Sequence, residues 1–437
     1  MSSIKARLRL YEDVAPREAN IASRREVGAS VLRFGNVRLE ERAPQVFQRR
    51  EVLENPSCGS RALRDFLPLS LTGIMELAVL SRQDIIHPAE CLFLDTETTG
   101  LSRGAATLPF LTGVAYFSRE RLILEQIFLN DPSGEDAYLE YISELLARYP
   151  YLVTYNGKSF DIPLIRNRLI LNRRRYESPL IHFDLLHILR KLFPRGSVPG
   201  HKQGDLENVL LSQTRKDDFP GAEIPQTYFD YKRYGETSRM DRIFEHNSLD
   251  VQGLAFLFLE AIRVYVERDV SSPAVRSGLA RLLAKNRRTE EAILALEGGA
   301  GKHEGGKSAG AKGDGEAKGN GEAEDETIPA EARERRRRLD GLFLAGLYRR
   351  RGLYERALEL YREVYREHAC RYACLSLAKI LEHRTRDVQG ALQATESLLD
   401  FQRNSPELSW RGAFSRERLA HRRNRLQKKL NARKTDA

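Results

Sequence analysis

The 437-residue sequence predicts an α/β domain followed by an all-α region of helical repeats. Residues 88–265 alternate short apolar runs with amphipathic helical patterns, which is typical of α/β folds. Residues 331–410 contain only helical hairpin patterns. Between these regions, 298–326 hold ten of the chain's 31 glycines and no aliphatic residue larger than alanine, so we expect a flexible linker there.

The α/β region begins with a strand, because Cys91–Asp95 (CLFLD) is nearly continuously apolar, as in a strand buried on both faces. The apolar runs at 110–117 and 121–129 flank a polar SRE and predict a hairpin. Residues 1–70 show no pattern that predicts a structure. The later predicted elements are a helix at 135–149, a strand at 151–156, a helix at 160–175, a strand at 180–184, a helix at 185–193 and a long helical region at 240–269.

The all-α region carries a repeat. Ala357 and Ala391 occupy equivalent points of two successive hairpins 34 residues apart, which is the period of the tetratricopeptide repeat. An earlier hairpin at 273–297 places Ala292 about one period plus the 29-residue linker before Ala357. The region therefore resembles a tetratricopeptide array, although the proline that should end each repeat is missing, and a generic helical bundle is the alternative.

Composition excludes several classes of protein. A hydrophobic content of 41% with 30% charged residues indicates a soluble chain with strongly polar segments. No apolar run reaches the roughly 18 residues of a membrane span, and the first twenty residues lack the apolar stretch of a signal peptide. Four scattered cysteines are too few for a disulfide framework. We therefore expect a cytoplasmic protein without a membrane partner.

The net charge of +10 indicates a polyanionic partner such as nucleic acid. The excess lies in residues 331–437, which hold 26 Lys and Arg against 14 Asp and Glu, whereas residues 1–330 hold 45 against 47. The tail at 411–437 is expected to be a basic helix or a disordered arm. We therefore expect the C-terminal region to contribute positive charge toward a phosphate backbone.

The first candidate site lies at the end of the apolar run. Asp95 and Glu97 are two residues apart, so strand geometry places both carboxylates on one face, at the sheet edge where α/β sites form. With no basic residue in the local sequence, the two acids repel each other unless a divalent cation such as Mg²⁺ or Mn²⁺ lies between them. A pair of solvated loop acids is the alternative, which the preceding buried strand and the following Thr-Thr-Gly turn disfavour.

Two further acidic motifs follow. A predicted strand runs into Asn156-Gly157 and then into a helix whose first turn carries Asp161, a position that the helix dipole alone also favours. His246 and Asp250 are four residues apart in a predicted helix and therefore share one face. A surface His–Asp pair is the alternative for this third motif.

In order and context, the three motifs resemble those of the DEDD 3′-5′ exonucleases of the ribonuclease H-like fold and, more closely, the YprB-type ribonuclease H-like domain. The resemblance covers about residues 70–265 and implies a mixed sheet flanked by helices, with the exonuclease domain at 71–268 and residues 1–70 outside it. The helical repeats also fit this family. The segments that carry the resemblance are DTETTGL (95–101), YNGKSFDIPLI (155–165), HFDLLHILRKLF (182–193), LENVLL (206–211), RKDDFPGAEIPQTYFDY (215–231) and EHNSLDVQGLA (245–255).

The resemblance implies that Asp95, Glu97, Asp161 and Asp250 hold two divalent cations, Mg²⁺ or Mn²⁺. Such a pair clamps the scissile phosphate, activates water and stabilises the leaving 3′ oxygen. It also implies that His246 orients or deprotonates the water. Better-known subtypes have a His with four residues, or a Tyr with three residues, before the last Asp. Here three residues separate His246 from Asp250, so the spacing of the Tyr type is combined with the chemistry of the His type.

Other residues are expected near the substrate. Lys158 and Arg103 are candidate phosphate contacts, for which solvated surface cations are the alternative. Asn156 is a candidate for positioning the substrate. Asp184 is a further candidate metal ligand, and the alternative is that it caps the helix at 185–193.

We therefore expect a metal-dependent 3′-5′ exonuclease that acts on single-stranded DNA or RNA, with the helical repeats offering a surface for nucleic acid or a protein partner. One alternative is a non-enzymatic adaptor that binds nucleic acid and recruits a protein partner. A second is a structure-selective endonuclease that uses the same metal site. The choice between DNA and RNA, the pathway and the oligomeric state lie beyond what these motifs specify.

Overall fold

The computed structural model describes residues 30–66, 78, 86–100, 107–176, 181–194, 198–215, 217–267, 273–298, 329–405 and 408–435. The predicted linker at 298–326 lies outside the described residues except for Gly298, and so does Arg103. The chain divides into two compact units, Met1–Val270 and Ser271–Ala437, which are described separately.

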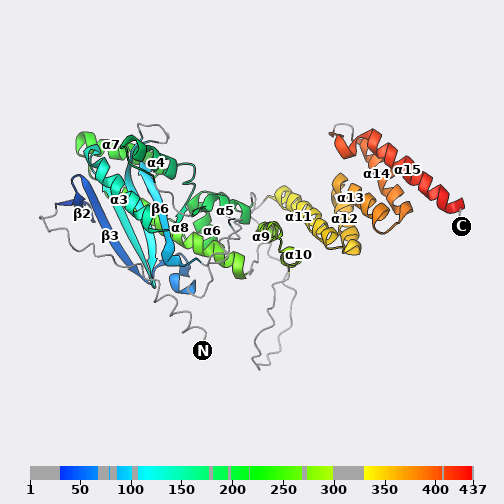
Figure 1. Ribbon diagram of the computed structural model, residues 1–437, viewed down its shortest axis with the longest axis horizontal. Helices are drawn as coiled ribbons and strands as arrows, with labels where there is room; N and C mark the ends of the chain where they lie inside the picture. The colour runs from blue at the N-terminus through cyan, green and yellow to red at the C-terminus, as the bar shows by residue number, and fades with distance from the viewer. Residues whose placement is uncertain are drawn as a thin grey trace, which may run out of the picture. The chain divides into compact units, whose positions relative to one another are not determined.

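The first unit is built on an eight-stranded mixed sheet in the order β1-β2-β3-β8-β7-β6-β9-β10 (Figure 1). Strands β6, β9 and β10 are parallel to one another and the other pairings are antiparallel. The α/β prediction and the predicted β7–β8 hairpin are confirmed. The strands are β1 (Val31–Phe34), β2 (Val37–Ala43), β3 (Val46–Glu54), β6 (Cys91–Thr98), β7 (Pro109–Ser118), β8 (Arg121–Leu129), β9 (Tyr151–Thr154) and β10 (Ile181–Asp184), and β4 (Ser57–Cys58) and β5 (Arg61–Ala62) form a separate pair.

Helices cover both faces of this sheet because its central strands are apolar on both sides. In β8, Ile127 belongs to one buried cluster and Phe128 to another, as expected for neighbouring strand residues that point in opposite directions. The first cluster is covered by α3 and α4, and the second by α7 and the start of α8. The helices of this unit are α3 (Glu135–Arg148), α4 (Asp161–Leu171), α5 (Leu185–Leu192), α6 (Gln203–Leu211), α7 (Ile224–Tyr234) and α8 (Met240–Glu267).

Residues 31–54, which the sequence patterns left without a structure and outside the domain, supply three strands of the sheet. β3 pairs with β8 over nine residues, from Val46–Leu129 to Glu54–Arg121. The apolar pattern is weak here because charged residues are frequent in β2 (VRLEERA) and occur on both faces of β3 (VFQRREVLE). The charge is partly used within the sheet, where Arg50 Nε lies 3.2 Å from the buried Glu125 Oε1.

The second unit is entirely helical in its described part, as predicted. Ala292, Ala357 and Ala391, the equivalent positions of the predicted repeat, are all fully buried. No helix in the described part of the chain is long and apolar enough to cross a membrane. The helices are α9 (Pro273–Lys285), α10 (Thr289–Leu296), α11 (Ala330–Arg350), α12 (Tyr354–His368), α13 (Arg371–His383), α14 (Val388–Asn404) and α15 (Arg416–Thr435).

The basic tail is a packed helix rather than an arm. In α15, Leu419 and Leu426 are seven residues apart and fully buried, so one face of the helix completes the core of this unit. Arg425 and Lys429 bind the buried Glu382 of α13 at 2.8 and 3.0 Å. Part of the positive charge of the tail is therefore neutralised within the protein.

The assignment of β1–β3 to the sheet can be tested by deletion. Removing residues 1–54 leaves β8 at an unpaired edge and takes Phe34, Leu39 and Phe47 from the core. Each buried side chain of this size contributes about 1.5–3 kcal/mol, so the loss approaches the whole stability of a domain. We expect the chain that lacks residues 1–54 to lose the cooperative thermal unfolding of the first unit. Parent-like unfolding of that chain would contradict the assignment.

Candidate metal centre

Asp95 and Glu97 lie near the C-terminal end of strand β6, which pairs with β7 and β9 inside the sheet. Asp95 lies opposite Gly113 of β7, and the register of the two strands shifts just after Glu97. A Cβ at Gly113 would come within 2.1 Å of Asn247 Oδ1, so any other residue at this position would force the Asn247 side chain to move. This close approach lets Asn247 of α8 donate from Nδ2 to Asp95 Oδ2 at 3.1 Å.

Asn247 is itself held from the other side. Gln126 Nε2, on β8, donates to Asn247 Oδ1 at 3.1 Å and to the carbonyl oxygen of Phe244 at 2.7 Å. Both amides are buried. Helix α8 is therefore fastened to the sheet at the level of Asp95, which places the following helical turn over the end of β6.

Asp161 opens α4, which follows β9, so it reaches the same sheet edge from a neighbouring strand. Thr96 Oγ1 donates to Asp161 Oδ1 at 2.5 Å and joins this carboxylate to β6. The turn between β9 and α4 is tight, because Asn156 has φ of 64° and a Cβ at Gly157 would meet Thr154 at 2.5 Å.

Asp184 braces that turn. Its carboxylate accepts from the backbone nitrogens of Asn156, Lys158 and Leu186 at 2.9, 3.1 and 3.2 Å. The last of these bonds caps α5, so the capping alternative describes the contacts of this side chain. With three of its acceptor sites used in this way, Asp184 holds the loop that carries Asn156 and Lys158 beside Asp161.

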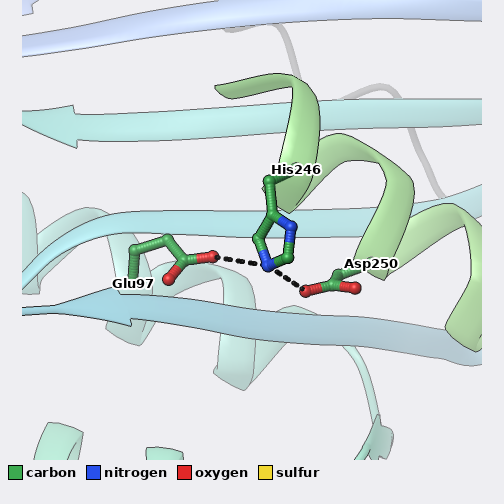
Figure 2. A group of neighbouring side chains, drawn as sticks. All are labelled: Glu97, His246 and Asp250. Atoms are coloured by element: carbon green, nitrogen blue, oxygen red, sulfur yellow. Dashed lines mark ion pairs between the residues drawn. The ribbon is translucent and has the colours of Figure 1, made fainter. Parts of the chain in front are cut away.

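The third motif completes the centre from α8 (Figure 2). His246 Nε2 lies 3.2 Å from Asp250 Oδ2 and 4.0 Å from Glu97 Oε1. One ligand atom of each of these three residues lies within 4.8 Å of the others. The structure thus brings Glu97, His246 and Asp250 together although Glu97 is about 150 residues away in the sequence.

Burial and mutual repulsion govern the charges of this centre. Burial, followed by repulsion from Asp250 and Asp161, holds the pKa of Asp95 well above its usual range. The pKa of Glu97 is raised by burial and by repulsion from Asp95 in the same way. Burial raises the pKa of Asp161 to about 6, although the hydrogen bond from Thr96 opposes this shift. Asp95, Glu97, Asp161 and Asp250 thus lie in one partly buried region, where the charges of Asp161 and Asp250 oppose the ionisation of Asp95 and Glu97.

Two residues of the centre were missed in the motif analysis. Arg215 contacts Glu207 Oε1 and Asp250 Oδ1 at 2.7 and 2.6 Å, with only 9% of its side chain exposed. Asp218 Oδ1 lies 2.6 Å from His246 Nδ1. Despite its partial burial, Asp218 has a lowered pKa because His246 and Arg215 stabilise its charge. Both residues lie in the segment RKDDFPGAEIPQTYFDY, but their spacing from Asp250 follows no local periodicity.

The donor set fits a hard divalent cation. Carboxylate oxygens are the ligands that Mg²⁺ and Mn²⁺ prefer, and a cation would relieve the repulsion that helps to raise the pKa values of Asp95 and Glu97. Arg215 supplies one positive charge on the Asp250 side, while Asp250 Oδ2 faces His246 and Glu97. Two of the expected substrate contacts lie in the turn between β9 and α4. Lys158 is exposed there, and Asn156 adopts the positive φ that makes the turn tight.

The chain is similar to a family model, to a bacterial protein and, over part of its length, to a solved structure. Residues 92–262 match the family model described as RNase_H superfamily. The chain is similar to the "Uncharacterized protein YprB" of Bacillus subtilis (strain 168), with 31% identity over 316 residues, which cover 70% of this chain and 68% of that protein. The family B DNA polymerase from the archaeon Pyrobaculum calidifontis matches 57% of this chain with a TM-score of 0.34 and 12% identity, and the match covers 33% of the polymerase.

Arg215 should be essential for the stability of the centre. Arg215→Met leaves Glu207, whose side chain is 1% exposed, and Asp250 without their cation. Removing one partner of a buried ion pair costs about 3–5 kcal/mol. We expect that loss in denaturant unfolding, whereas Arg239→Met, which breaks an exposed pair with Glu223, should cost less than about 1 kcal/mol. Equal effects of the two changes would contradict the role of Arg215.

The metal-free protein should be more stable when Glu97 is neutralised. The pKa of Glu97 is raised in the folded state. The folded protein is therefore destabilised as pH rises above about 4.3, the pKa of a glutamate in the unfolded chain. In EDTA at pH 8, Glu97→Gln should raise Tm by about 2–4 °C, the equivalent of 1 kcal/mol in a domain of this size. Near pH 3 the gain should vanish, since Glu97 is then almost fully protonated in both the folded and the unfolded state. A gain that is independent of pH would point to packing instead.

Proposed function

Because this chain belongs to the YprB-type family of the ribonuclease H superfamily, we propose that its acidic centre hydrolyses phosphodiester bonds of nucleic acid with divalent cations. More finely, we propose a 3′-5′ exonuclease that acts on single-stranded DNA or RNA. The observation that carries the proposal is that partly buried, mutually repelling carboxylates and His246 lie together at the C-terminal end of β6.

The proposed metal ligands are Asp95, Glu97, Asp161 and Asp250, which would hold Mg²⁺ or Mn²⁺. Bound cations of this kind supply the Lewis acidity that activates water and stabilises the leaving oxygen. The protein contributes fixed orientation, since Asn247 holds Asp95 and Thr96 holds Asp161 through the hydrogen bonds described above. Preorganised carboxylates need no rearrangement when substrate binds.

His246 is suited to move a proton at its Nε2 atom. Its Nδ1 faces Asp218 at 2.6 Å, and this carboxylate favours the tautomer with the proton on Nδ1. Nε2 then faces the space beside Glu97 and Asp250 and can accept a proton from water. This arrangement supports a general-base role for His246 despite the unusual spacing between His246 and Asp250.

The proposed activity is tested with 5′-labelled single strands of DNA and RNA in Mg²⁺ or Mn²⁺. The protein should shorten them stepwise from the 3′ end, and EDTA should stop the reaction. Asp95→Asn should lower the rate at least about 100-fold, because loss of an outer-shell partner alone costs 10–100-fold. Glu54→Gln, at an exposed acid on β3, should cleave like the parent.

Three results separate the proposal from its rivals. Undiminished cleavage by Asp95→Asn would remove the acidic centre from the reaction. Cleavage of a circular strand would favour an endonuclease with the same site. Binding of nucleic acid without any cleavage, and without a metal-dependent rise in Tm, would favour the adaptor.

A further inference from the structure

A groove of about 570 Å³ runs along the outer side of α4, between this helix and the edge strand β10. This volume falls within the roughly 300–1,000 Å³ of small-ligand sites. Its lining residues come from the turn before α4, from α4 itself, from the segment after it and from β10, and they are Lys158, Ile162, Pro163, Arg166, Asn167, Ile170, Tyr176 and His182.

Two lining residues of the groove, Lys158 and Ile162, flank Asp161 of the acidic centre in the sequence. Lys158 lies three residues before Asp161, and its backbone nitrogen is held by Asp184 as described above. From there Ile162, Arg166 and Ile170 follow at intervals of four residues and form one stripe along the helix. The stripe is about 12 Å long at 1.5 Å per residue, which is the length of three to four stacked bases at about 3.4 Å.

The lining combines exposed cations with exposed apolar surface. Lys158 and Arg166 are exposed, and no acidic residue is among those that line the groove. Ile170 is 58% exposed, an unusual position for a large aliphatic side chain. Tyr176 offers an aromatic ring at the same groove. Cations for phosphates and apolar faces for bases are what single-strand binding sites contain.

The β10 side of the groove is neutral. His182 Nε2 is 2.8 Å from Thr154 Oγ1, and burial lowers the pKa of His182 to about 4, with a smaller contribution from the charge of Lys158. At neutral pH the positive charge therefore comes from Lys158 and Arg166 alone among the lining residues. A polyanion that ends at the acidic centre would meet cations along this path and no competing acid.

We propose that this groove holds the last nucleotides of a single strand as its end enters the acidic centre. Lys158 and Arg166 contact phosphates, and Ile170 and Tyr176 contact bases. The proposal rests on the proposed nuclease function. It identifies the substrate class as an unpaired strand, because bases that are paired with a complementary strand cannot lie against an apolar wall.

The test measures equilibrium binding of fluorescent 12-nucleotide dT and U strands to the full chain carrying Asp95→Asn. Adding Arg166→Ala should weaken binding about 5- to 10-fold for both strands and lower the slope of log K against log salt by about 0.7. Ile170→Asp should weaken binding similarly. Leu171→Asp is the matched control, because Leu171 is the next residue, is 54% exposed and does not line the groove. It should change binding less than about 2-fold.

The proposed role of the groove would be overturned if Arg166→Ala and Ile170→Asp bound the strands as well as the Leu171→Asp control, with parent-like thermal unfolding of all three variants. So would displacement of the strand by duplex DNA at equal concentration, because a duplex hides its bases. If Arg166→Ala weakens binding but the chain with Asp95 intact cleaves no nucleic acid, the proposed function is refuted and the proposed groove stands. Parent-like binding and cleavage by the groove variants would refute the groove alone.

Discussion

The repulsion among partly buried carboxylates is the constraint on which the first unit depends. Asp95, Glu97 and Asp161 have raised pKa values because burial removes water that would stabilise their charges. Repulsion from neighbouring acids raises the pKa values of Asp95 and Glu97 further. An arrangement of this kind opposes folding, so it must be supported by contacts elsewhere. Sites with such perturbed groups are typical of catalysis and metal binding.

The support comes from hydrogen bonds and from one buried cation. Thr96 and Asn247 each donate to a carboxylate of the centre. Arg215 joins Asp250 to Glu207, and through Asp218 the same loop also contacts His246. These contacts stabilise the charged forms only in part, because Asp95 and Glu97 keep raised pKa values. The remaining unfavourable charge is the property that a divalent cation would remove.

Positive charge is used differently in the two units. The basic helix α15 directs Arg425 and Lys429 to the buried Glu382, so its charge contributes to holding the helical unit together. Two exposed cations, Lys158 and Arg166, line the groove along α4, in a part of the sequence with almost no net charge. The excess charge of the C-terminal region and the cations of the proposed groove therefore belong to different units of the chain.

The sequence by itself determined the helices and strands whose periodicity is strong, and the acidic residues that lie in or at the ends of these elements. The β7–β8 hairpin, the start of α4 at Asp161 and the shared face of His246 and Asp250 follow from local spacing. β1–β3 escaped prediction because β1 is only four residues long and charged residues interrupt the apolar pattern of β2 and β3. The pairing of β3 with β8 is recognisable only in the folded chain. Arg215 and Asp218 escaped for a related reason: an irregular loop has no period, so only the folded chain decides which acids its side chains meet.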